Sequence, residues 1–197
     1  MADKVLFFII FVIIAFSFSY RQYAVNPRDA YLLRAGLVCT LVADYCMLIL
    51  YNNTMGLVFF ICVQSIYVFR HTSQVKVFNP LLMLSGIYAA LSYLTPLTFE
   101  TRLAAVYACA LIAGVLSAII CRKSYPFPNN VFILVGMLMF LMCDVNVALM
   151  NILTGEMGQT VSRILIWAFY LPSQALLSVS GAKITRRVTN DRNRSYS

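Results

Sequence analysis

The chain alternates between long apolar runs and short polar breaks. The apolar segments cover residues 4–22, 30–51, 55–70, 79–96, 102–121, 130–151 and 160–182. Their lengths lie around the roughly 20 residues that an α-helix needs to cross the hydrocarbon core of a bilayer. The pattern therefore predicts an all-α fold, a polytopic transmembrane helical bundle of about seven spans.

The breaks between these segments carry residues that are typical of turns and helix starts. They include Asn26-Pro27, Asn52-Asn53, Asn79-Pro80 and Thr154-Gly155. An asparagine followed by proline has the form of a helix cap and a first helical residue. We therefore expect each break to separate two helices.

The composition agrees with a membrane protein. Hydrophobic residues make up 61% of the 197 residues, charged residues 11%, and the mean hydropathy is +0.82. A soluble domain carries roughly 25% charged residues, so this chain lacks the polar residues that would cover a water-facing surface. We expect one transmembrane helical domain over residues 1–182 and a short basic cytoplasmic tail over residues 183–197.

The net charge of +8 comes from basic residues that lie between the apolar segments, which argues against a nucleic-acid partner. When alternate breaks are assigned to opposite sides of a membrane, twelve Lys and Arg fall on one side and three on the other. Basic residues accumulate on the cytoplasmic side. The count predicts a multi-pass protein of the cell membrane with its N-terminus outside and its C-terminus in the cytoplasm.

Two acidic residues interrupt the apolar segments at corresponding places. Asp44 and Asp144 each follow a glycine by eight residues, Gly36 and Gly136, and each lies seven residues before the outer end of its segment. At 1.5 Å per residue both lie roughly 10 Å below the outer boundary. A carboxylate inside a membrane usually marks a functional site. We therefore treat Asp44 and Asp144 as a candidate catalytic pair at one depth.

Other polar residues share helix faces near this depth, at spacings of three, four or seven residues. We take five of them as candidate substrate-binding residues: Gln64, Tyr67, Tyr170, Gln174 and Asn151. Such groups also join helices through hydrogen bonds without any further function. Both interpretations are open for each residue taken singly.

Several kinds of chemistry are excluded by the residues present. His71 is the only histidine, no Cys and His cluster exists, and nucleotide-binding glycine motifs are absent, so we expect no metal and no cofactor. A G-x-S-x-G elbow is also absent. The remaining groups are paired carboxylates with amide and phenol donors. Such a pair can share one proton, which suits acid-catalysed addition of water to a lipid or proton-coupled transport.

Four motifs occur in order along the chain: Gly36-x7-Asp44, Gly56 through Phe60 to Gln64-x-x-Tyr67, Gly136-x-x-x-Phe140-x-x-x-Asp144, and Tyr170-x-x-x-Gln174. In order and spacing they resemble the YhhN family, over residues of about 34–71 and 131–181. That family includes the lysoplasmalogenases, which hydrolyse the vinyl ether bond of lysoplasmalogens. Its members typically have Gly, His and Ser where this chain has Ala43, Gln64 and Cys143.

The resemblance implies an integral membrane hydrolase that needs no metal. One protonated Asp would give its proton to the vinyl ether, and the other carboxylate would stabilise the resulting cation and position water. The products would be a fatty aldehyde and a glycerophospho-base. The implied partners are a lysophospholipid substrate and the surrounding membrane lipids.

Two further functions stay open. The matching Gly-x7-Asp motifs suggest that segments 1–3 and 5–7 form a parallel repeat joined by segment 4, as in some carriers, so the chain could be a small-solute or proton-coupled transporter. It could also be a non-catalytic lipid-binding or sensory membrane protein, which the residues at positions 43, 64 and 143 favour.

Overall fold

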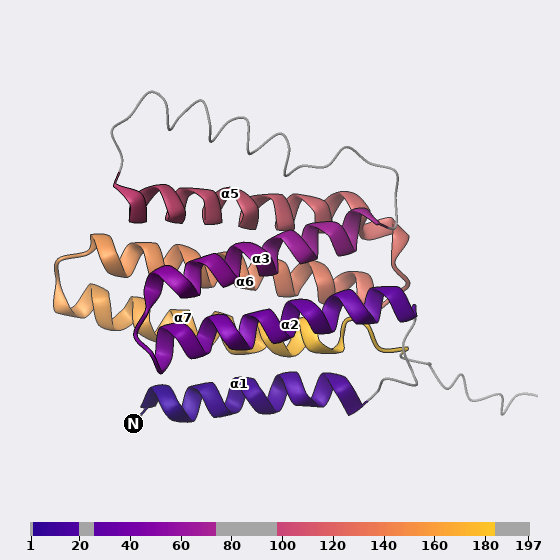
Figure 1. Cartoon of the computed structure of the whole chain (residues 1–197), viewed down its shortest axis with the longest axis horizontal. Helices are drawn as coiled ribbons and strands as arrows, with labels where there is room; N and C mark the ends of the chain where they lie inside the picture. Colours follow the sequence, from indigo (N-terminus) through magenta and orange to yellow (C-terminus); the bar gives the residue numbers. More distant parts are fainter. Residues whose placement is uncertain (1, 20–25, 74–97, 184–197) are drawn as a thin grey trace, which may run out of the picture.

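A computed structural model describes residues 2–19, 26–73 and 98–183, which fold into α-helices (Figure 1). The helices are α1 (Ala2–Ser19), α2 (Pro27–Leu48), α3 (Asn53–Thr72), α5 (Phe99–Ile120), α6 (Asn129–Ile152) and α7 (Glu156–Val179), with the 3-10 turn η2 (Cys121–Ser124) after α5. The predicted helical bundle is confirmed. The predicted segment 79–96 lies outside the described residues, as does most of the predicted tail.

The helices begin one to four residues before the apolar segments that predicted them. The Asn26 side chain accepts a hydrogen bond from the backbone N–H of Arg28, and the Asn52 side chain accepts one from that of Met55. Thr98 caps α5 in the same way. The starts of α2, α3 and α5 are thus partly polar, because the first N–H groups of a helix need side-chain partners.

Four of the described helices are long and apolar enough to cross a bilayer: Pro27–Leu48, Asn53–Thr72, Phe99–Ser124 and Asn129–Ile152. Helix α1 is apolar but shorter. Helix α7 is as long as α6, and the residues that it buries are mostly polar. Together with the composition, these helices identify a helical membrane protein.

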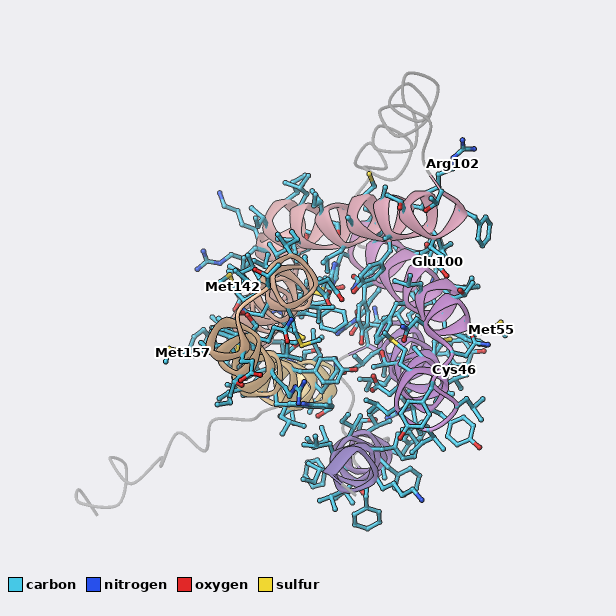
Figure 2. All side chains as sticks on the ribbon, turned by 90° about the vertical axis from the view of Figure 1, so that its left-hand side faces the viewer. Cys46, Met55, Glu100, Arg102, Met142 and Met157 are labelled. Carbon is cyan, nitrogen blue, oxygen red and sulfur yellow. The ribbon has the colours of Figure 1, made fainter. Side chains whose placement is uncertain are left out.

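The six described helices stand side by side in a ring, as the view along their axes shows (Figure 2). Around the ring, α1 contacts α2, followed by α3, α5, α6 and α7, and α7 returns to α1. The α2–α3 and α6–α7 connections lie at one end of the bundle, which we call the hairpin end (Figure 1). The opposite end, which we call the Arg70 end, holds the last turns of α3, α5 and α7.

Four aromatic side chains fill the middle of the ring. Phe60 packs against Tyr107 and Phe140 with ring centroids 5.8 and 6.0 Å apart, and Phe140 stacks on Tyr170 at 5.7 Å. Tyr107 and Tyr170 come from helices on opposite sides of Phe140. Packing against these rings therefore fixes the orientation of both tyrosine side chains and the position of their hydroxyl groups.

Gly36 and Gly136 let neighbouring helices approach closely. A Cβ added at Gly36 would lie 2.7 Å from Cε1 of Tyr67 on α3, and one added at Gly136 would lie 2.9 Å from Cγ of Leu177 on α7. Both distances are too short for a real contact. The two motif glycines therefore set the packing of the α2–α3 and α6–α7 pairs.

Candidate functional site

Each motif aspartate accepts a hydrogen bond from a tyrosine on another helix. The Tyr170 hydroxyl on α7 donates to Oδ2 of Asp44 on α2 at 2.7 Å. The Tyr107 hydroxyl on α5 donates to Oδ2 of Asp144 on α6. Asp44 is buried and Asp144 is half-buried. Hydrogen bonds to a carboxylate are among the stronger ones in proteins, so both carboxyl groups have defined orientations.

The two carboxyl groups form one site, which we call the carboxylate pair. They lie close enough to interact electrostatically with each other, and the Cys143 thiol interacts with both. The structure thus brings Asp44 and Asp144 together inside the ring, as the matching motifs predict. Within the described parts of the chain, no three His, Cys, Asp or Glu side chains are grouped so that they could hold a metal ion.

Gln64 and Gln174 are completely buried, and each lies near one of the two tyrosines that donate to the pair. The Gln64 carboxamide lies next to the Tyr107 hydroxyl, and Gln174 follows Tyr170 by one helical turn. Among the described residues, neither carboxamide makes a hydrogen bond of normal geometry through its nitrogen or its oxygen. Both carboxamides therefore have unused hydrogen-bonding capacity in the interior of the bundle.

The other two candidate residues lie further from the pair. Tyr67 is completely buried, packs against Gly36 and stacks on the His71 ring at 6.4 Å, one turn nearer the Arg70 end than Gln64. Asn151 is exposed at the hairpin end, and its side chain donates to the carbonyl of Val147 on its own helix. The structure therefore does not bring Asn151 to the carboxylate pair.

Tyr107 is the site residue that the sequence did not single out. It lies eight residues from Phe99, where α5 begins, and Asp144 lies eight residues from Ile152, where α6 ends. Both are thus about 12 Å from the hairpin end at 1.5 Å per residue. A phenol at the depth of an acid was the signal that could have identified it.

A second polar cluster lies at the Arg70 end, and we call it the Arg70 cluster. The Arg70 guanidinium donates to both carboxylate oxygens of Asp29 at 2.8 Å and to Oγ of Ser180 at 3.0 Å. The Tyr125 hydroxyl also donates to Asp29, at 2.9 Å. Arg70 has no exposed surface, so it forms a buried ion pair with Asp29 rather than a solvated surface charge.

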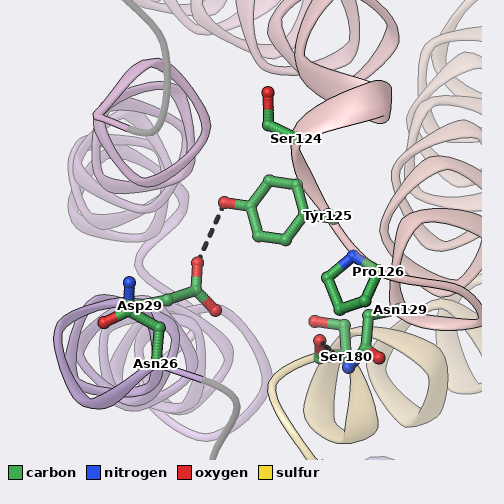
Figure 3. Close-up of a pocket in the computed structure, with 7 residues that line it drawn as sticks. All are labelled: Asn26, Asp29, Ser124, Tyr125, Pro126, Asn129 and Ser180. Atoms are coloured by element: carbon green, nitrogen blue, oxygen red, sulfur yellow. Dashed lines mark hydrogen bonds between the residues drawn. The ribbon is translucent and has the colours of Figure 1, made fainter.

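A cavity of about 250 Å³ opens beside the Arg70 cluster (Figure 3). It is lined by Asn26, Asp29, Ser124, Tyr125, Pro126, Asn129 and Ser180. Burial raises the pKa of the Tyr125 hydroxyl well above its ordinary value, so this group remains a donor. Asp29 and Asp44 are fifteen residues apart on α2, about 22 Å along the helix, so this cavity is separate from the carboxylate pair.

His71 belongs to a third polar contact between these two regions. Its Nδ1 lies 2.9 Å from Oγ of Ser117, and Ser117 donates its own proton to the carbonyl of Gly114. The serine therefore accepts a hydrogen bond from the histidine. A nucleophilic serine would need the opposite polarity, so this contact is structural.

Comparison with known proteins extends the resemblance seen in the motifs. The model of the YhhN family matches residues 3–181, which is nearly the whole chain. The match includes α1 and α5, where the sequence motifs gave no resemblance. No curated protein and no solved structure matches the chain.

Proposed function

The chain belongs to the YhhN family, and we propose that it is a membrane hydrolase of lysoplasmalogenase type. It would cleave the vinyl ether bond of a lysoplasmalogen to a fatty aldehyde and a glycerophospho-base. Family membership supports the lysoplasmalogenase-like class. The observation that carries the reaction is the carboxylate pair, in which each acid is oriented by a tyrosine.

The proposed reaction starts with a proton on one of the two acids. This acid protonates the β-carbon of the vinyl ether, and the remaining carboxylate stabilises the oxocarbenium ion that forms. The same carboxylate then takes a proton from water as the water oxygen adds to the cation. The resulting hemiacetal transfers its hydroxyl proton to the glycerol oxygen and separates into the aldehyde and the glycerophospho-base. No step of this reaction needs a metal ion.

The hydrogen bonds of the pair suit this chemistry. Both tyrosines donate to Oδ2, and no hydrogen bond to Oδ1 of Asp44 or Asp144 comes from the described residues. Each acid therefore keeps one oxygen for substrate or water. The low dielectric of the bundle interior strengthens the attraction between a carboxylate and a developing cation.

The proposal includes seven spans, the fourth of them over residues 79–96, with the N-terminus outside and the C-terminus in the cytoplasm. A parallel repeat of the first three and the last three segments, suggested by the matching Gly-x7-Asp motifs, is part of the same proposal. This topology predicts that a membrane-impermeant thiol reagent labels an Asn52→Cys variant in intact cells. A Lys123→Cys variant would be labelled only after permeabilisation, and the reverse result would contradict the orientation.

A lipid-binding or sensory role without catalysis is the second candidate. It is favoured by Gln64, because an amide cannot transfer a proton as the histidine typical of the family can. A carrier would use the same carboxylate pair to move protons. Release of aldehyde from a lysoplasmalogen separates the hydrolase from both alternatives, and variants of Asp44 and Asp144 tie that activity to the pair.

A further inference from the structure

Gln64 and Gln174 have an unusual combination of burial and missing partners. Both side chains are completely buried, and together they leave two nitrogens and two oxygens without a hydrogen bond of normal geometry among the described residues. Buried polar groups in native proteins almost always have a partner, and a group without one is an unfavourable feature that needs an explanation. A ligand that binds to the two amides would supply the missing bonds.

The two glutamines occupy equivalent places in the two halves of the ring. Gly36 meets Tyr67, and Gln64 precedes Tyr67 by three residues. Gly136 meets Leu177, and Gln174 precedes Leu177 by three residues. Measured along the bundle axis, the backbone of each glutamine therefore lies about 4.5 Å closer to the hairpin end than the glycine on the neighbouring helix.

The carboxylates lie further along in the same direction. Asp44 and Asp144 follow their glycines by eight residues, about 12 Å, so the backbone levels of acids and amides differ by about 7.5 Å. Side chains on a helix lean towards its N-terminus. On α2 and α6 this moves the acids towards the Arg70 end, and on α3 and α7 it moves the amides towards the hairpin end. The two pairs therefore approach each other.

The tyrosines connect each amide to an acid. The Gln64 amide lies beside the Tyr107 hydroxyl, which donates to Asp144. Gln174 lies one turn from Tyr170, which donates to Asp44. A group held by the two amides would therefore be adjacent to both Tyr–Asp pairs.

We propose that Gln64 and Gln174 together bind one hydroxyl group next to the carboxylate pair, supplied either by the sn-2 carbon of a lysolipid or by a water molecule. A carboxamide offers one acceptor and one donor group, and a hydroxyl both donates and accepts. A hydroxyl donates to one of the two amide oxygens, whereas an ester at the sn-2 position has no proton to donate and would leave both amide oxygens unpaired. The site thus favours a lysolipid over a diacyl lipid, and this inference rests on the proposed function.

The test uses the purified full chain in lipid nanodiscs and a lysophospholipid whose vinyl ether is replaced by an alkyl ether, which cannot be hydrolysed. A matched lipid carries an O-methyl group at sn-2. Binding of both lipids is measured for the wild type, Gln64→Met and Gln174→Met. Gln159→Met is the control, because the Gln159 amide is already paired with the carbonyl of Leu153.

Removing an unpartnered buried amide should stabilise the ligand-free protein, so we expect both buried variants to melt about 2–4 °C higher than the wild type. If the bound hydroxyl belongs to the lipid, we expect the wild type to bind the free-hydroxyl lipid at least about 10-fold more tightly than the O-methyl lipid, a difference of roughly 1.4 kcal/mol. The preference disappears in Gln64→Met and Gln174→Met and persists in Gln159→Met.

If the bound hydroxyl belongs to a water molecule, we expect the wild type to bind both lipids equally. Gln64→Met and Gln174→Met should then release aldehyde from a lysoplasmalogen at least about 10-fold more slowly than the wild type. Lower melting temperatures with unchanged binding and unchanged aldehyde release in both variants would overturn the proposal. If the wild type releases no aldehyde but prefers the free hydroxyl, the hydrolase fails while the hydroxyl site stands.

Discussion

The hydroxyl of Tyr107 on α5 donates a hydrogen bond to the carboxylate of Asp144 on α6. This contact mirrors the one between Tyr170 and Asp44 across the ring. Each acid is therefore held by a phenol that a neighbouring aromatic ring keeps in place, Phe60 for Tyr107 and Phe140 for Tyr170. Four residues from four helices thus form two hydrogen-bonded Tyr–Asp pairs.

We expect Tyr107→Phe to lower aldehyde release strongly while the protein stays folded. The change removes one hydrogen bond to a carboxylate, worth about 1.5–3 kcal/mol, or about 10- to 100-fold in rate. Tyr31→Phe is the matched control, because Tyr31 is 72% exposed on α2. Equal rates for Tyr107→Phe and the wild type would remove Tyr107 from the site.

Tyr170→Phe should have an effect of similar size, and the double variant should lose less than the product of the two single losses. Residues that act as one unit are not additive. The comparison is a double-mutant cycle on the aldehyde release rate. Fully multiplicative losses would mean that the two Tyr–Asp pairs act independently.

The Arg70 cluster should matter for stability rather than for chemistry. Arg70→Met leaves the Asp29 carboxylate buried without its cation, which costs about 3–5 kcal/mol when a buried pair is broken. Arg70→Met combined with Asp29→Leu should recover part of this loss. Unfolding monitored by circular dichroism measures both, with the exposed Lys123→Met as control. A single variant as stable as the wild type would contradict this role.

Gly114→Ala should disturb Gln64 without unfolding the protein. An added Cβ would lie 2.8 Å from Oε1 of Gln64 and 2.8 Å from Cε of Met137, and both atoms are ends of flexible side chains. We expect a nearly unchanged melting temperature and a reduced preference for the free-hydroxyl lipid. Gly155→Ala is the control, since nothing lies within 4 Å of its added Cβ. An unchanged lipid preference would show that the position of Gln64 does not matter.

Gly36→Ala should behave differently from Gly114→Ala. Its added Cβ would meet the ring of Tyr67, which is completely buried and cannot move aside as a flexible chain end can. Overpacking of this kind costs about 1–3 kcal/mol. We expect a lower melting temperature in a thermal unfolding experiment, and an unchanged one would contradict the close packing of α2 and α3.

The sequence predicted the helices of the described residues and singled out the two acids, for a physical reason. Apolar runs of bilayer length must form helices, because no water is available to satisfy their backbone groups. Asp44 and Asp144 were conspicuous because each is the lone acid in such a run. Their depth followed from counting residues along each helix, which needs no knowledge of neighbouring helices.

The contacts between helices were harder to predict from the sequence. Aromatic residues are common in the apolar segments of this chain, so Tyr107 was not conspicuous, and only the packing of α5 beside α6 makes it a partner of Asp144. Arg70 and Asp29 lie near the ends of their segments, where charges are usually solvated. Their pairing depends on the antiparallel packing of α2 against α3, which the periodicity of each segment does not specify.

Aldehyde release from a lysoplasmalogen by the purified protein tests the central claim most directly. We expect the wild type to release aldehyde and Asp44→Asn and Asp144→Asn each to lose at least about 100-fold in rate while remaining folded, since each variant removes one of the two acid–base groups. Asp191→Asn, outside the predicted spans, should match the wild type. A folded wild type that releases no aldehyde from lysoplasmalogens with several headgroups, or full activity in either variant of the pair, would contradict the proposed hydrolase.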